Sequence, residues 1–224
     1  LLPRLEMTYG LCGSIHRWFR SYLDGRSQFV RIGTTSATLL LCGVPQGSVL
    51  GPILLLLYTA DLLGLVESHG LRPHLYADDT QIHGSCRPGD TAQLQSRVSA
   101  CVDGVGLWMR SNRLQLNTAK TEVLWCASAR RQHQIPDDPL SVDSDLVLPA
   151  RSVRDLGIYL DSDLSMRTHV TRTVSSCFAV LRQIRSIRRS VSPSVMQSLI
   201  VSLVLSRLDY GSATLADLPA CLLD

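Results

Sequence analysis

The chain has 224 residues, of which 45% are hydrophobic and 18% charged, and its formal net charge is +3. That length suits one large domain or a domain with a helical appendage, and the composition excludes wholesale disorder. So small a net charge does not by itself indicate a nucleic-acid-binding protein.

The cysteines and histidines exclude two further classes of protein. None of the seven cysteines has CxxC spacing, and their number is odd. This favours reduced, buried thiols in an intracellular protein, nuclear or cytoplasmic, over a disulfide framework or a zinc site. The six histidines also lack metal-site spacing, so no structural metal is expected.

The first part of the chain predicts a helix followed by a hairpin. Ile15–Leu23 is amphipathic and ends at the turn Asp24–Gly25. Gln28–Ile32 and Ala37–Cys42 alternate like strands, and Gly33–Ser36 is the predicted turn between them.

A long apolar segment, Val49–Val66, is almost long enough to span a bilayer. It contains Gly51-Pro52 near its start and Asp61 near its end, and it lacks basic flanks. These features favour a buried core helix beginning near Pro52, and no membrane partner is expected.

Two short strands, His74–Ala77 and Thr80–His83, are predicted to meet at the acidic turn Asp78-Asp79. Gly89–Thr91 can cap the helix that follows. Apolar residues recur every three to four positions along that helix, at Leu94, Val98, Cys101, Val105 and Trp108.

The next segments read as short strands separated by loops. The expected strands are Leu114–Leu116, Glu122–Trp125, Asp145–Leu148 and Leu156–Leu160. Ser128–Pro139 is polar and contains prolines, which indicates a loop.

Two helices are predicted at the end of the chain. The first carries one apolar face, formed by Val170, Val174, Cys177, Leu181 and Ile184, and the second begins at Ser192-Pro193. Between Leu164 and Leu208 the sequence has seven arginines and no Asp or Glu. This pattern is typical either of a phosphate-binding surface or of a solvated helix face. The order of elements indicates an α+β domain followed by a helical segment.

Asp78 and Asp79 are the residues whose chemistry stands out. Two adjacent carboxylates at a strand turn repel each other, and a divalent cation relieves that repulsion. In nucleotidyl transfer, carboxylates from separate strands converge on two metal ions. The alternative is that Asp-Asp simply marks a surface hairpin.

The surrounding motifs decide between these interpretations. Four blocks resemble, in the right order, the polymerase of non-LTR (LINE-type, jockey-like) retrotransposons, a reverse transcriptase family. They are Gly43–Pro52 (GVPQGSVLGP), Tyr76–Asp79 (YADD), Trp108–Glu122 (WMRSNRLQLNTAKTE) and Val153–Asp161 (VRDLGIYLD). The resemblance implies a partial polymerase palm of short antiparallel strands and packed helices over residues 1–161, and a helical thumb-like segment over 162–224.

The resemblance also implies roles for single residues. Asp78 is the firmer metal ligand and Asp79 supports it, with two Mg²⁺ ions in the complete site. Gln46 and Gly47 bind the incoming nucleotide. Lys120 helps to protonate the departing pyrophosphate, and it is the single lysine beside 21 arginines. An ammonium can give up a proton near neutral pH once its pKa is lowered, whereas a guanidinium cannot. The implied partners are an RNA template, a DNA primer and deoxynucleoside triphosphates.

The sequence departs from the family pattern before Gly43. The first palm motif, which supplies another Asp, has no counterpart there, and the fingers residues that hold the triphosphate are also missing. We therefore expect a fragment of an RNA-directed DNA polymerase that is inactive as this chain. Two alternatives stay open: a non-catalytic nucleic-acid-binding remnant and a decayed transposon fragment.

Overall fold

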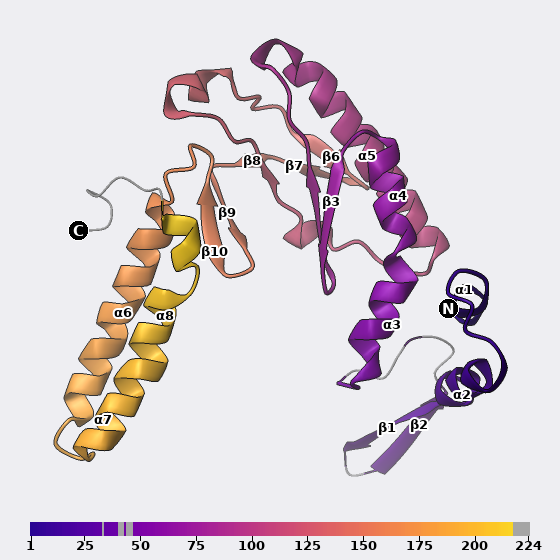
Figure 1. Cartoon of the computed structure of the whole chain (residues 1–224), viewed down its shortest axis with the longest axis horizontal. Coiled ribbons are helices and arrows are strands. Elements are labelled where there is room, and N and C mark those ends of the chain that lie inside the picture. Colours follow the sequence, from indigo (N-terminus) through magenta and orange to yellow (C-terminus); the bar gives the residue numbers. More distant parts are fainter. Residues whose placement is uncertain (33, 40–42, 44–46, 217–224) are drawn as a thin grey trace. The chain divides into compact units, whose positions relative to one another are not determined.

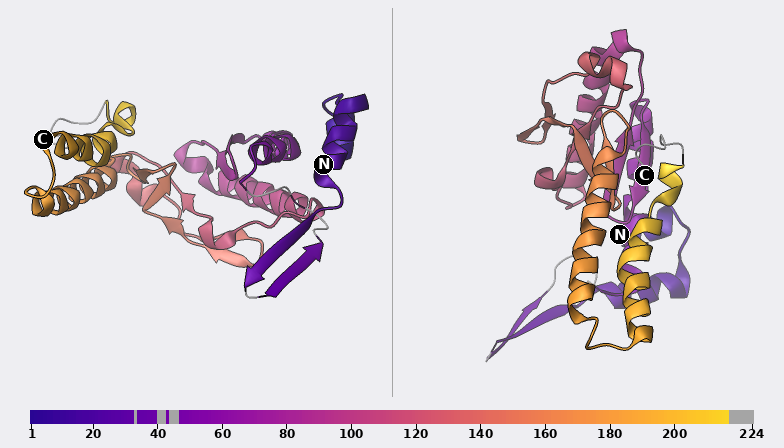
Figure 2. Two further views of the ribbon diagram at one scale, coloured as in Figure 1. Left: turned by 90° about the horizontal axis from the view of Figure 1, so that it is seen from below. Right: turned by 90° about the vertical axis from the view of Figure 1, so that its left-hand side faces the viewer.

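The computed structural model describes residues 1–32, 34–39, 43 and 47–216. They form two compact units, whose elements appear in Figures 1 and 2. The first unit comprises Leu1–Cys86 and Ser96–Gln115, and the second comprises Arg87–Gln95 and Leu116–Asp224. Helices and short two-stranded sheets make up both units, which agrees with the expected α+β class.

The first unit begins with two helices, α1 (Leu2–Met7) and α2 (Gly13–Leu23), which pack on each other. A hairpin follows, made of β1 (Ser27–Ile32) and β2 (Thr34–Leu39). Ile32 pairs with Thr34, so the second strand begins three residues earlier than predicted. Thr34 and Thr35 are β-branched, and such residues favour extended backbone over a turn.

The apolar segment forms α3 (Leu50–Thr59) and α4 (Asp61–Ser68). The helical stretch Leu50–Ser68 is, in the part of the chain that the structure describes, the one long and apolar enough to cross a membrane by length and composition. Only 22% of it is buried, so the expectation of a buried core helix is wrong for most of its surface. The reason is geometric, because one face alone packs inward, through Leu54, Leu62 and Val66.

The acidic turn joins β3 (Arg72–Tyr76) to β4 (Asp79–His83), an antiparallel pair in which Tyr76 pairs with Asp79. This confirms the predicted hairpin. The long helix α5 (Thr91–Ser111) is also confirmed, and Leu94, Cys101 and Val105 of its apolar stripe are buried. Helix α4 approaches α5 at Gly104, where a Cβ would lie 3.7 Å from the Leu65 side chain, an ordinary van der Waals distance.

The second unit is built on short strands. Their bounds are β5 (Val123–Leu124), β6 (Leu140–Val142), β7 (Asp145–Val147), β8 (Pro149–Ala150), β9 (Ser152–Asp155) and β10 (Ile158–Asp161). They pair as the antiparallel hairpins β6–β7 and β9–β10 and as the parallel pair β5–β8. The strand expected at Leu114–Leu116 does not form, and the expected loop contains a 3₁₀ segment at Ala129–Gln134.

The helices of the second unit are α6 (Arg167–Ile187), α7 (Pro193–Ile200) and α8 (Ser206–Asp209), with a π-helical turn at Val201–Leu205 joining the last two. Figures 1 and 2 show α6 and the α7–α8 stretch running side by side. Cys177, Ile184 and Val204 form their buried core, with Val180, Met196, Leu199 and Ile200 against it. The predicted face is therefore partly confirmed, since Val174 and Leu181 stay exposed.

The cysteines in the described part of the chain are free thiols, but only two are buried, Cys101 and Cys177. The other three, Cys12, Cys86 and Cys126, are exposed, so the expectation of buried thiols is wrong for them. Cys126 lies just beyond β5, outside the paired residues of that strand. Cys42 and Cys221 lie outside the described residues.

Candidate active site

Asp78 lies at the tip of the β3–β4 hairpin. Because Tyr76 pairs with Asp79, the loop between the strands consists of Ala77 and Asp78 alone. Ala77 has a φ of 55°, the positive value that two-residue hairpin loops need at their first position. An L-residue there costs about 1–2 kcal/mol, and such strain is concentrated at functional sites. The turn places the Asp78 carboxylate in an exposed position.

A cleft of about 1030 Å³ opens beside this turn, within the first unit. Ala77 and Asp78 form one part of its wall, and Gly47, Ser48 and Gly51 form another. The Ser48 hydroxyl accepts a hydrogen bond from the backbone N–H of Gly51 at 3.0 Å, which fixes the chain where α3 begins. Two of the blocks that are separate in the sequence therefore meet at one cleft.

Gly47 has a φ of 77°, a conformation that glycine adopts without steric cost. A Cβ at this position would meet nothing within 4 Å, so the backbone here faces open space. Glycine at this position therefore permits the positive φ of the turn, and it also lets a ligand approach the backbone closely.

Residues after α5 close another side of the cleft. Asn112, Arg113 and Leu114 line it. Arg113 is exposed and has a φ of 56°, so it stands in the left-handed region that bulky residues rarely adopt. The cleft thus combines one carboxylate, Asp78, with one guanidinium, Arg113, on a largely apolar wall.

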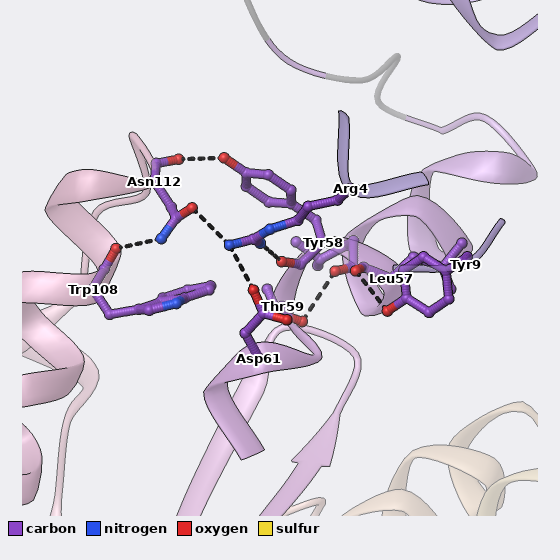
Figure 3. A network of polar contacts seen from close by, with 9 residues as sticks. Arg4, Tyr9, Leu57, Tyr58, Thr59, Asp61, Trp108 and Asn112 are labelled. Carbon is purple, nitrogen blue, oxygen red and sulfur yellow. Dashed lines mark hydrogen bonds and ion pairs between the residues drawn. The ribbon is translucent and has the colours of Figure 1, made fainter. Parts of the chain in front are cut away.

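Behind this wall, Arg4 of α1 is the centre of a polar network (Figure 3). Its guanidinium forms an ion pair with Asp61 at 2.9 Å, donates to the side chain of Asn112 at 3.0 Å and donates to the carbonyl of Tyr58. Its Cζ lies 4.7 Å from the ring centroid of Tyr58 and 5.4 Å from that of Trp108. Arg4 therefore ties together helices α1, α3, α4 and α5.

Asn112 connects this network to the cleft. Its side-chain amide donates to the Trp108 carbonyl at 2.8 Å, while its own carbonyl accepts from the Tyr58 hydroxyl at 2.9 Å. A cleft residue held by so many partners keeps one orientation, because each bond restricts the same side chain and backbone.

Known proteins resemble the chain over most of its length. The family model described as "Reverse transcriptase (RNA-dependent DNA polymerase)" matches residues 6–160. The chain belongs to the reverse transcriptase family. The family interpretation of the four sequence blocks is therefore confirmed.

Curated relatives of this reverse transcriptase chain come from retrotransposons of flies. The RNA-directed DNA polymerase from mobile element jockey of Drosophila funebris is 29% identical over 172 residues, which cover 72% of this chain and 18% of that protein. The probable RNA-directed DNA polymerase from transposon BS of Drosophila melanogaster is 27% identical over 175 residues, covering 74% and 19%. The chain thus spans less than a fifth of the length of these two relatives. No solved structure matches it significantly.

The structure places two of the expected reverse transcriptase residues at one cleft of the first unit. Asp78 and Gly47 line the same cleft, whereas Asp79, the first residue of β4, is exposed and is not part of its lining. Lys120 belongs to the second unit, where it ends a 3₁₀ turn and is exposed. Gln46 lies outside the described residues.

The carboxylates of Asp78 and Asp79 are of a kind that binds Mg²⁺, but they are too few to hold two ions. Mg²⁺ prefers oxygen ligands such as those of Asp78 and Asp79. Among the residues that the structure describes, no group of three or more His, Cys, Asp and Glu side chains could hold a metal ion. Asp78 and Asp79 alone would therefore supply only part of the oxygen ligands that two Mg²⁺ ions need.

Sequence reasoning missed two residues of this cleft, Asn112 and Arg113. Both lie inside the block Trp108–Glu122, so the sequence did mark the segment. Two structural features distinguish them: Arg113 has a positive φ, and Asn112 accepts a hydrogen bond from Arg4. Neither is visible in the order of residues.

Proposed function

We propose that the chain is part of an RNA-directed DNA polymerase of a retrotransposon. The carrying observation is the cleft of the first unit, where Asp78 of the YADD turn lies with Gly47 of the GVPQGSVLGP block. Membership of the reverse transcriptase family supports the same conclusion. In this proposal the partners are an RNA template, a DNA primer and deoxynucleoside triphosphates, and residues 1–161 and 162–224 correspond to palm and thumb-like parts.

In this proposal each site residue has one task. Asp78, with Asp79 beside it, supplies carboxylate oxygen to Mg²⁺, which when bound stabilises the charge on the reacting phosphates. Gln46 and Gly47 contact the incoming nucleotide, and the missing Cβ of Gly47 lets its backbone come close. Lys120 donates a proton to the departing pyrophosphate, a step for which an ammonium suits better than a guanidinium.

We also propose that this chain alone does not extend primers. Asp78 is the one carboxylate among the described residues lining the cleft. Two-metal chemistry requires ligands from more than one strand, and small losses of geometry cost large factors in rate. A non-catalytic role in binding nucleic acid is the second candidate, favoured by the arginine-rich second unit.

Primer extension tests both statements. The purified chain is given an RNA template, an annealed DNA primer, the four deoxynucleoside triphosphates and Mg²⁺. No extension is expected. Extension that Asp78→Ala abolishes would refute the proposed inactivity.

A chimera tests the polymerase assignment itself. Residues 43–161 replace the matching segment of the jockey polymerase of Drosophila funebris, and circular dichroism verifies that the chimera folds. We expect extension that Asp78→Asn abolishes and that Asp90→Asn, a change at another exposed carboxylate, leaves intact. A folded chimera that extends primers equally well with Asn at position 78 contradicts the role given to Asp78.

A further inference from the structure

Apolar side chains of the paired helices in the second unit stay exposed in two regular stripes. One stripe lies on α6 and the other on the α7–α8 stretch, and in each the members follow one another at intervals of four and then three residues. Their exposed fractions range from 36% for Leu181 to 58% for Phe178. Residues at this spacing lie on one side of a helix. The members are Val174, Phe178 and Leu181 on α6, and Val201, Leu205 and Leu208 on the α7–α8 stretch.

The two stripes lie on the same side of the helix pair. Cys177 and Val204 point toward the facing helix, since both are buried in the core between the helices. The next residue in each case, Phe178 or Leu205, lies about 100° further round its helix. The helices are antiparallel, because only the short segment 188–192 joins α6 to α7 and the helices run side by side (Figure 1). In an antiparallel pair, the same rotation turns both residues toward the same side.

Two hydrogen bonds agree with this arrangement. The Cys177 thiol donates to the Val204 carbonyl at 3.9 Å, which places these two residues at the same level along the pair. Each residue of the α6 stripe therefore lies within about 3 Å, along the helix axis, of the level of a residue in the other stripe. Arg207 donates to the Ser176 hydroxyl, and both of these residues are rotated the opposite way, toward the other side of the pair. The two stripes thus form one surface, which we call the apolar face.

Arginines stand at both ends of the α6 stripe. Arg167 lies seven residues before Val174 and Arg185 lies four residues after Leu181, so both continue the spacing of the stripe, and both are exposed. From one arginine to the other the helix rises by about 27 Å. The sequence has no Asp or Glu from residue 164 to residue 208. The apolar face is therefore flanked by positive charge, and its own segments carry no negative charge.

We propose that the apolar face binds an amphipathic α-helix of a partner protein, with acidic residues at both ends of the partner's apolar stripe. A third helix laid along the pair covers both stripes at once, which is how amphipathic helices are recognised by pairs of helices. Burial of Phe178 and Leu205 supplies affinity. The carboxylates of the partner meet Arg167 and Arg185, which select an acidic helix over a basic one.

Other occupants fit the charges and the apolar surface less well. In a symmetric dimer of this chain the apolar face would meet its own copy, and arginines would meet arginines. A nucleic-acid duplex presents phosphates on its outside and would leave the apolar stripes uncovered. An acidic amphipathic helix satisfies the apolar centre and the positive ends together.

Binding is measured by fluorescence anisotropy with three labelled synthetic peptides of about 18 residues each, the length of the stripe with its arginines. The first peptide has leucines at intervals of four and three residues and glutamates on both flanks and at both ends. The second has lysine in place of every glutamate, and the third has the composition of the first with its leucines moved out of the stripe. We expect the first peptide to bind about tenfold more tightly than either of the others, and to bind less tightly as the salt concentration rises.

Variants of the chain locate the binding surface. Phe178→Gln and Leu205→Gln are each expected to weaken binding of the first peptide about tenfold. Val195→Gln is the matched control, because Val195 is an apolar residue of similar exposure, 47%, that belongs to neither stripe. Arg185→Gln is expected to weaken binding several-fold and to reduce its salt dependence, whereas Arg130→Gln, at an exposed position away from the helices, should change neither. Circular dichroism and urea unfolding verify that each variant is folded.

Several results would overturn the proposal. One is that none of the peptides binds, and another is that the glutamate and lysine peptides bind equally well. Equal losses in Phe178→Gln and Val195→Gln would remove the apolar face as the site. Binding of phosphatidylserine vesicles that Phe178→Gln abolishes, with no binding of the glutamate peptide, would assign the face to a lipid surface. Dimerisation of the chain in sedimentation, lost in Phe178→Gln, with no peptide binding would assign it to a second copy.

This inference goes beyond the proposed polymerase function and does not depend on it. Neither peptide binding nor its salt dependence involves primer extension, and Asp78→Ala is expected to bind the glutamate peptide as tightly as the unmodified chain, since Asp78 belongs to the other unit. Failure of the chimera to extend primers therefore leaves the apolar face unaffected, and failure of peptide binding leaves the polymerase assignment unaffected.

Discussion

The contact between Gly157 and Tyr210 can be tested by adding a single methyl group. Gly157 has a φ of 92°, and the Cβ of Gly157→Ala would lie 3.0 Å from the Tyr210 ring. An L-residue in this backbone region costs about 1–2 kcal/mol. The ring must also move, which loses its hydroxyl bond to Leu156, a loss of about 0.5–1.5 kcal/mol.

One term opposes these losses. Alanine restricts the unfolded chain more than glycine does, which stabilises the folded state by about 0.4–1 kcal/mol. The net expectation is a loss of about 2 kcal/mol in the free energy of unfolding, well above the effect of an ordinary surface substitution.

Urea unfolding followed by far-ultraviolet circular dichroism measures this loss, and a double-mutant cycle separates its parts. In the background Tyr210→Ala the ring is gone, so Gly157→Ala is expected to cost only the backbone strain, about 1 kcal/mol or less. If Gly157→Ala costs the same in both backgrounds, the close approach to Tyr210 contributes nothing and the reasoning is refuted.

Three further predictions concern stability. Burial acts to raise the pKa of Asp161, but hydrogen bonds from Thr168 and Ser165 outweigh it and hold the pKa below its ordinary value. The stability that Asp161 contributes is therefore present above the ordinary aspartate pKa and is lost as the pH falls through the lower folded-state pKa, so acid titrations of Asp161→Asn should show a weaker pH dependence of unfolding in that acidic range. Arg4→Ala should cost about 2–3 kcal/mol in urea unfolding, from its lost hydrogen bonds and ring contacts, and Arg4→Lys less because it keeps the ion pair with Asp61; equal losses would contradict this account. Ser192 accepts from the Val195 N–H at 3.4 Å at the start of α7, so Ser192→Ala should lower the thermal midpoint by an amount equivalent to about 1 kcal/mol, with Ser190→Ala, at an exposed position before the helix, as the control.

Local patterns in the sequence predicted the helices and turns that are formed by residues close together in the chain. The stripe along α5 and the Ser192-Pro193 start of α7 are read from residues within a few turns, and both are confirmed. The hairpin at Asp78 is confirmed for the same reason.

Elements that depend on distant partners were not predictable in this way. Strands β5 and β8 have two residues each, and their parallel pairing joins segments on either side of a complete hairpin. No periodicity can develop over two residues. At Leu114–Leu116 the sequence predicted a strand that does not form. Its alternating pattern suits a strand, but the structure gives it no partner among the described residues.

The candidate site likewise has one part that the sequence predicted and one part that it did not. The family blocks predicted one site for Asp78 and Gly47, and in the structure both residues line one cleft. The wall formed by Asn112 and Arg113 depends on contacts between residues as far apart as Arg4 and Asn112, separated by 108 positions. Such contacts follow from the packing of helices and not from any local signal.

The Arg4 network has a consequence for the order in which the first unit can assemble. Its partners come from helices α3, α4 and α5, and the farthest bond spans 108 positions of the chain. Closing so long a loop costs entropy that local contacts must first offset. During synthesis, the bond between Arg4 and Asn112 can therefore form only after nearly all of the first unit has left the ribosome, whereas the bonds of Arg4 to Tyr58 and Asp61 can form earlier.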